Sequence, residues 1–357
     1  MIFYEDFYKN YKPDSRTYED FMNTQYAPLV SADREALLKL VMDKEYGWLK
    51  DTCYKTEVEC VKEEKWLSGN IIRKELKLKV VFEDETAEIP FVAFIPVKKE
   101  KVPAFLYISF ESGFPNKYSP VEEICDSGFA FVSFGYKDVA DDKDDGFISC
   151  LERHFIGKRE EKTAGKICLW STVAIMIMDY MQTVDEIDKE NIAVVGHSRL
   201  GKTALLTAAT DERFAFAYSN DAGCSGDALA RGTNGEEIKD ICKNFPYWFC
   251  ENYKKYANNE QNMPFDQHYL IATIAPRYVH LGSASEDWWA DPVSQYLSCV
   301  AAGDAFKNGF CYEEKMPEIN DEFFEGDVGF HMRKGLHYYS REDWLKSIKF
   351  VKMKTQV

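Results

Sequence analysis

The sequence predicts an α/β fold in which helices cover both faces of a mostly parallel sheet. Two patterns indicate it: alternating, half-exposed strands come first, and short uninterrupted apolar strands then alternate with helical segments. A third observation is that 45% of the residues are apolar, with 25 Phe and 21 Tyr, which is enough for a large core. We therefore expect one domain over residues 1–357, with residues 1–65 as a helical extension packed on it.

The expected elements can be placed in chain order. Residues 31–49 carry apolar side chains at helical spacing, and Ser31 or Asp33 can cap this first helix. Residues 73–82 alternate apolar and charged side chains, as a half-exposed strand does. Further strands are expected at 89–97, 104–110, 129–134, 192–195, 214–219 and 278–282, and further helices at 163–181, 202–210 and 341–353.

Composition excludes several classes of protein. The net charge of −16, without a run of Lys or Arg, argues against nucleic-acid binding. The longest apolar-rich stretch, residues 167–181, is shorter than the roughly 20 residues of a membrane span and contains Asp179. Residues 1–14 do not resemble a signal peptide and ten cysteines suit a reducing compartment, so we expect a cytoplasmic protein unless a signal was removed. No C-x-x-C pair is present, and we expect neither a metal nor a cofactor.

The strongest local pattern lies around Ser198. The apolar segment 192–195 runs into Gly196-His-Ser198-Arg-Leu-Gly201 and continues as a helix rich in Ala and Leu. This strand–turn–helix setting is typical of the nucleophile in the α/β-hydrolase fold, where the turn is strained and the serine projects above the sheet. The second glycine stands one place later than in the usual G-x-S-x-G.

A serine nucleophile needs a histidine base, which in this fold comes late in the chain. His337 has that position, in a loop before the final helix, whereas the nearby His331 lies in a strand-like Phe-His-Met segment. His154, His268 and His280 lie in the wrong part of the topology. We therefore expect His337 to be the base.

Several ordered motifs from about residue 162 onward resemble carbohydrate esterase family 15, the glucuronoyl esterases and their bacterial relatives. The motifs are Trp170, Gly-His-Ser-Arg-Leu-Gly-Lys at 196–202, Ser-Asn-Asp-Ala-Gly-Cys-Ser-Gly at 219–226, Phe-Pro-Tyr-Trp-Phe at 245–249, Pro-Phe-Asp-Gln-His at 264–268 and Trp-Ala-Asp-Pro at 289–292. The first 100 residues resemble the family only loosely.

This resemblance implies three substrate-contacting residues. Arg199 would stabilise the oxyanion, Lys202 would contact sugar hydroxyls and Trp248 would pack on the uronate ring. The alternatives are that Arg199 and Lys202 pair with structural groups and that Trp248 packs in the core or a lid.

The acid that orients His337 has more than one candidate. Asp287 follows the strand at 278–282, where most α/β hydrolases carry their acid. Asp221 matches the position where many members of the resembled family have a Glu, one methylene longer. We favour Asp287, with Asp221 and Glu286 as alternatives, and Asp221 could instead bind the sugar.

These features together predict a serine esterase. The family resemblance implies that it acts on a small carbohydrate ester or an oligosaccharide, most specifically a glucuronoyl ester. The first alternative is a deacetylase of xylan or another acylated sugar. A serine peptidase is a further alternative, although we expect no propeller-sized domain that would filter peptides. A non-catalytic binding protein is disfavoured because serine, histidine and acid candidates occur together.

Overall fold

The computed structural model describes residues 7–9, 11, 14–17, 19, 29, 33–313 and 315–355. Within these ranges ten strands form one sheet in the order β1-β2-β3-β5-β4-β6-β7-β8-β10-β9. Neighbouring strands from β5 to β10 are parallel, whereas β1, β2, β3 and β9 pair antiparallel. The predicted fold class is therefore confirmed. The strands are β1 (Lys55–Trp66), β2 (Ile71–Val81), β3 (Thr86–Pro96), β4 (Val102–Ser109), β5 (Ala130–Gly135), β6 (Ile187–His197), β7 (Phe216–Asn220), β8 (Tyr278–Ala284), β9 (Glu322–Phe323) and β10 (Val328–Arg333).

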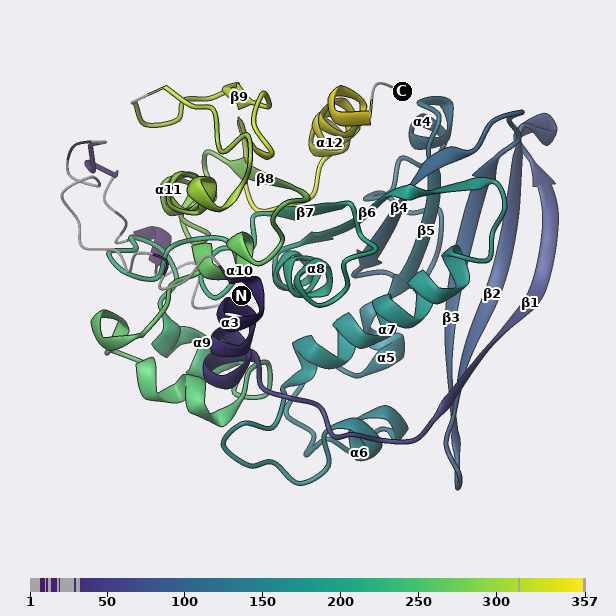
Figure 1. Cartoon of the computed structure of the whole chain (residues 1–357), viewed down its shortest axis with the longest axis horizontal. Coiled ribbons are helices and arrows are strands. Elements are labelled where there is room, and N and C mark those ends of the chain that lie inside the picture. Colours follow the sequence, from purple (N-terminus) through teal and green to yellow (C-terminus); the bar gives the residue numbers. More distant parts are fainter. Residues whose placement is uncertain are drawn as a thin grey trace.

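Helices lie on both faces of the sheet (Figure 1). One face carries α7 and α8, and the other carries α4 and α12 (Figure 1). The α-helices are α3 (Arg34–Val41), α4 (Val121–Asp126), α5 (Tyr136–Val139), α6 (Cys150–Phe155), α7 (Lys166–Met181), α8 (Arg199–Thr210), α9 (Ile238–Asn244), α10 (His268–Ala272), α11 (Pro292–Ala302) and α12 (Arg341–Thr355). Among the described helices, none is both long and apolar enough to cross a membrane.

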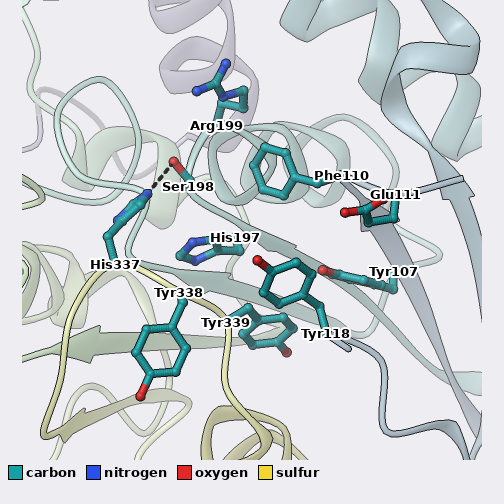
Figure 2. A pocket seen from close by; sticks show the side chains of 10 residues that line it. All are labelled: Tyr107, Phe110, Glu111, Tyr118, His197, Ser198, Arg199, His337, Tyr338 and Tyr339. Atoms are coloured by element: carbon teal, nitrogen blue, oxygen red, sulfur yellow. Dashed lines mark hydrogen bonds between the residues drawn. The ribbon is translucent and has the colours of Figure 1, made fainter. Parts of the chain in front are cut away.

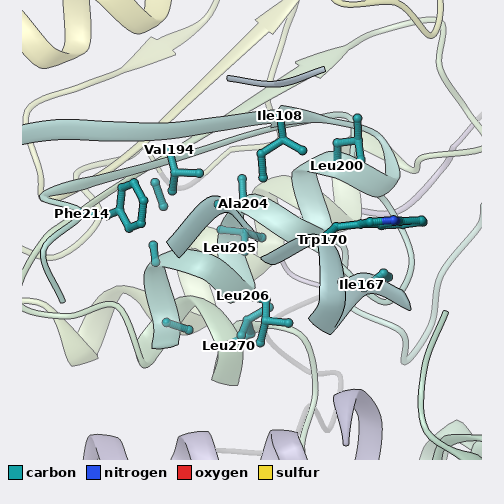
Figure 3. Packing of buried hydrophobic residues seen from close by; sticks show 14 of the residues in the cluster. Ile108, Ile167, Trp170, Val194, Leu200, Ala204, Leu205, Leu206, Phe214 and Leu270 are labelled. Carbon is teal, nitrogen blue, oxygen red and sulfur yellow. The ribbon is translucent and has the colours of Figure 1, made fainter. Parts of the chain in front are cut away.

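Alternate residues of the central strands pack into two separate hydrophobic cores, one on each face of the sheet. In β4, Leu106 and Ile108 belong to the larger core, whereas Phe105 and Tyr107 belong to the smaller one. Figure 3 shows the larger core, where α7 and α8 pack against the sheet. Strands buried on both faces have no polar alternation, which is why they appear in the sequence as continuous apolar runs.

The N-terminal part differs from the expected helical extension. The helix expected at 31–49 begins at Arg34 and is capped by Asp33, whose side chain accepts a hydrogen bond from the Glu35 amide. It continues through a π-helical turn (Met42–Tyr46) and ends at Gly47, which has φ 81°. Ser31, the other predicted cap, lies outside the described residues.

Residues 55–65, expected within the helical extension, instead belong to the edge strand β1. Every residue of β1 is exposed or half-exposed, so the strand shows no apolar periodicity in the sequence. Cross-strand ion pairs with β2 take the place of core contacts, for example Lys79 with Glu59 at 2.7 Å. Charged edge strands of this kind also resist pairing with other chains.

Candidate active site

Ser198 lies at the turn between β6 and α8. Its backbone has φ 57° and ψ −129°, a conformation that non-glycine residues rarely adopt. Gly196 permits this turn, because a Cβ there would lie 1.9 Å from the Leu200 carbonyl oxygen. Gly201 permits α8 to approach β7, because a Cβ there would lie 2.7 Å from Ser219 Oγ. The displaced second glycine therefore stands where the helix meets the sheet.

The predicted base and nucleophile contact each other directly. His337 Nε2 lies 2.9 Å from Ser198 Oγ, and Figure 2 shows this hydrogen bond at the edge of a pocket. His337 comes from the loop between β10 and α12, and its side chain is 28% exposed. His331, the rival candidate, is buried within β10, where its Nε2 lies 3.0 Å from Asp343 Oδ1.

Asp287 contacts the other nitrogen of His337. Its Oδ2 lies 2.5 Å from His337 Nδ1, and its side chain is fully buried just beyond the end of β8. Asp287, and not Glu286, therefore makes this contact. The Glu286 backbone amide donates to the Gly335 carbonyl, which ties the loop after β8 to the loop that carries His337.

Asp221 lies beside this pair but is engaged elsewhere. Its Oδ1 accepts a hydrogen bond from the Ala284 amide at 2.8 Å, and its Oδ2 lies 3.7 Å from Arg333 Nη2. Burial raises the pKa of Asp221 well above its usual value, and the negative charges of Asp287 and Asp343 raise it further. The positive charge of Arg333 and the hydrogen bond from the Ala284 amide oppose this rise.

The N-terminal segment packs against the loop that carries Asp287. Tyr11 stacks on Trp288 with ring centroids 4.2 Å apart, and Phe7 packs edge-on against Trp289. Arg16 Nη2 lies 2.5 Å from Asp291 Oδ1. Residues from the start of the chain therefore support the position of the acid.

Arg199 is held by the buried carboxylate of Asp142. The two side chains form an ion pair, and the guanidinium carbon of Arg199 lies 4.7 Å from the centre of the Trp248 ring. The same carboxylate accepts a hydrogen bond from Trp248 Nε1 at 2.8 Å. Arg199 thus pairs with a structural carboxylate, as in the alternative considered above, and still lines the pockets on both sides of Ser198.

A polar pocket lies on one side of Ser198 and His337. It is lined by Lys202, Asp221, Glu236, Trp248 and Trp289 among others. Lys202 is buried and its Nζ donates to the carbonyl oxygens of Ala222 and Cys224, so it shapes the loop after β7 as well as facing this pocket. Burial raises the pKa of Glu236 to about 7, and the positive charge of Lys202 opposes this rise.

A second pocket, of about 330 Å³, opens on the other side of Ser198 (Figure 2). Its lining is mainly aromatic and comprises Tyr107, Phe110, Glu111, Tyr118, His197, Ser198, Arg199, His337, Tyr338 and Tyr339. The sequence analysis did not find this pocket or Glu236. The aromatic residues of the lining and Glu236 follow no spacing rule, whereas His197, Ser198, Arg199 and His337 were considered there.

Comparison with known proteins places this geometry in a family. A family model described as "Glucuronyl esterase, fungi" matches residues 79–308, which is more than half of the chain. The chain belongs to carbohydrate esterase family 15. It is therefore a carboxylic ester hydrolase of the glucuronoyl esterase type.

Relatives within carbohydrate esterase family 15 cover most of the chain. Carbohydrate esterase MZ0003, from an unknown prokaryotic organism, is 31% identical over 333 residues, covering 81% of this chain and 76% of that protein. A promiscuous family 15 esterase from a marine bacterial metagenome superposes with a TM-score of 0.82 at 29% identity, covering 89% and 90% of the two chains. The glucuronoyl esterase from Solibacter usitatus gives the same TM-score at 27% identity, covering 90% and 92%.

Fungal relatives match a shorter part. The 4-O-methyl-glucuronoyl methylesterase 1 of Phanerochaete chrysosporium is 30% identical over 151 residues, which is 39% of this chain and 31% of that protein.

Proposed function

We propose that this esterase hydrolyses esters of a hexuronic acid, with glucuronoyl esters as the preferred substrates. The observation that carries the proposal is the position of Ser198 between two unlike pockets. The polar pocket holds about 20 Å³, and Lys202, Glu236 and two tryptophans line it. These groups suit contact with hydroxyl groups at the edge of a sugar ring. The aromatic pocket suits the alcohol half of the ester. Ser198 at their junction would face the ester carbonyl.

The proposed reaction proceeds through an acyl-enzyme. Ser198 Oγ attacks the ester carbonyl carbon while His337 Nε2 takes the hydroxyl proton. Asp287 holds the imidazole by Nδ1 and stabilises the imidazolium that forms. The resulting oxyanion is stabilised by Arg199, and a fixed donor of this kind typically supplies ~3–4 kcal/mol.

When the tetrahedral intermediate collapses, the bond to the alcohol oxygen breaks and His337 gives its proton to that oxygen. The second half of the reaction then repeats these roles with water. His337 then takes a proton from water, which attacks the acyl-enzyme carbonyl. The uronic acid leaves, and the proton returns from His337 to Ser198 Oγ.

The substrate assignment is tested by comparing kcat/KM for benzyl glucuronate, benzyl galacturonate, 4-nitrophenyl acetate and acetylated xylo-oligosaccharides. We expect the highest value for benzyl glucuronate, with Ser198→Ala as the inactive control. A higher value for the acetylated xylo-oligosaccharides would favour the deacetylase alternative. That outcome is relevant because the similar metagenomic esterase is described as promiscuous.

A further inference from the structure

His197, the residue directly before Ser198, forms part of the wall of the aromatic pocket. Its ring lies beside His337, with centroids 4.6 Å apart, and is parallel to the ring of Tyr339 at 6.1 Å. Figure 2 shows His197 next to Ser198 and His337 on the pocket side. Its side chain is nearly buried, with 6% of the residue exposed. The mechanism above leaves His197 without a role.

The hydrogen bonds of Asn220 determine which nitrogen of His197 carries the proton. Asn220 Nδ2 donates to the Gly282 carbonyl and to Asp343 Oδ1, both at 3.2 Å, and both of these partners are acceptors. The amide oxygen of Asn220 must therefore face His197, where it lies 2.7 Å from Nδ1. An amide oxygen only accepts, so Nδ1 of His197 carries a hydrogen.

Nε2 of His197 is left as a hydrogen-bond acceptor. Burial lowers the pKa of His197 well below its usual value, and the neighbouring His337 lowers it further. The ring is therefore neutral at pH 7, and Nε2 keeps its lone pair. Among the residues that the structure describes, no donor is paired with Nε2, although the residue lines the pocket.

We propose that Nε2 of His197 accepts a hydrogen bond from a free hydroxyl group on the alcohol half of the ester, so that His197 selects alcohols with a second hydroxyl. This rests on the proposed function, in which the aromatic pocket receives the alcohol. The alcohol that fits is an arylalkyl alcohol: Phe110 and Tyr118 supply aromatic contacts, and His197 supplies the acceptor. An alcohol without a donor leaves that acceptor unpaired in a nearly buried position, which disfavours its ester.

Ester pairs that differ only in the hydroxyl hydrogen test the proposal. Glucuronate esters of 3-(4-hydroxyphenyl)propanol and 3-(3-hydroxyphenyl)propanol are compared with those of their O-methyl ethers, and the readout is the ratio of kcat/KM within each pair. We expect the wild-type enzyme to favour at least one hydroxylated ester by about 3- to 10-fold, the worth of one net hydrogen bond. His197→Phe should bring that ratio to about 1, and His197→Met provides the same test if the Phe variant does not fold.

Two matched variants separate the effect of His197 from that of the Tyr338 and Tyr118 hydroxyl groups. Tyr338→Phe should keep the wild-type ratio, since Figure 2 shows the Tyr338 hydroxyl pointing away from Ser198. Tyr118→Phe removes one rival acceptor of the pocket lining and should also keep the wild-type ratio. The proposal is overturned if the wild-type ratio is about 1 for both pairs, if it survives in both His197 variants, or if Tyr118→Phe abolishes it.

Acetate esters of the same alcohols distinguish this inference from the proposed function. If glucuronate esters are not hydrolysed but the acetates show the ratio and its loss on His197 substitution, the uronate assignment fails and the role of His197 stands. If glucuronate esters are hydrolysed with no dependence on the hydroxyl, the role of His197 fails and the uronate assignment stands.

Discussion

At the scale of single residues, the backbone of Ser198 links activity to stability. Its φ of 57° with ψ −129° is unfavourable for any residue with a Cβ. Ser198→Ala and Ser198→Gly should both reduce ester hydrolysis by several orders of magnitude. The free energy of unfolding of Ser198→Gly should nonetheless exceed that of Ser198→Ala by about 1 kcal/mol, because glycine relieves the strain. Ser198→Gly should therefore unfold at a higher temperature. Calorimetry of the two variants measures the difference, and equal stabilities would show that the turn is unstrained.

Single substitutions also test whether Asp287 or Asp221 is the acid that orients His337. Asp287→Asn should lower kcat by about 10⁴-fold, because the Nδ1–H of His337 loses its carboxylate. Asp221→Asn should lower it less than about 10-fold, because an amide resembles the protonated carboxyl group that burial favours at that position. Steady-state kinetics with 4-nitrophenyl acetate measures both variants. Comparable losses in the two would mean that Asp221 shares the role of the acid.

Glu236 should make inhibition by the product depend on pH. Burial raises its pKa to about 7, Lys202 and Arg199 oppose this rise, and the negative charge of Asp240 adds to it. Below this pH Glu236 is neutral, and above it the carboxylate repels the glucuronate anion released by hydrolysis. The inhibition constant of glucuronate should therefore rise as the pH passes from 6 to 8. Glu236→Gln should show no such rise, and a rise that persists in that variant would assign it to another group.

At the scale of secondary-structure elements, the loop after α5 connects two of the proposed binding residues. Asp142 in this loop accepts hydrogen bonds from Trp248 Nε1 and from the Tyr247 hydroxyl, and it pairs with Arg199. Asp142→Asn removes the charge that holds Arg199 and should lower kcat about 10-fold. Tyr247→Phe removes one hydrogen bond from the same carboxylate and should change kcat less than about 2-fold. Equal effects would mean that Asp142 only packs the loop.

The elements also separate what the sequence reveals from what it hides. Helix α7 and strand β6 were predictable because burial on nearly all sides gives each of them a continuous apolar run in the sequence. Strand β1 was not, because β2 stabilises it through the backbone and ion pairs, and these leave no apolar pattern.

The candidate site likewise contains residues that the sequence predicts and residues whose roles depend on the fold. Ser198 and His337 follow from strand order and loop position. Lys202 could not be interpreted fully, because its contacts with the carbonyls of residues 222 and 224 depend on a loop path that only the fold defines. Glu236 and His197 acquire their properties from burial by residues distant in sequence.

At the scale of the whole molecule, one sheet runs through the described part of the chain from β1 to β9, with a core on each face. We predict that residues 1–357 unfold as one unit. Far-ultraviolet circular dichroism and tryptophan fluorescence of the Ser198→Ala variant should give the same melting temperature. Two separated transitions, one of them removed by deleting residues 1–65, would show that the N-terminal part folds independently.

The packing of Phe7, Tyr8, Tyr11 and Arg16 against the loop that carries Asp287 has a consequence for biosynthesis. Arg16 and its partner Asp291 are 275 positions apart in sequence. At a translation rate of 5–20 residues per second, Arg16 leaves the ribosome roughly 15 to 55 s before Asp291 does. Phe7, Tyr8 and Tyr11 are without their aromatic partners for that interval, which makes this segment a site where a chaperone could bind the nascent chain. Asp287 reaches its supported position only after residue 291 has been made.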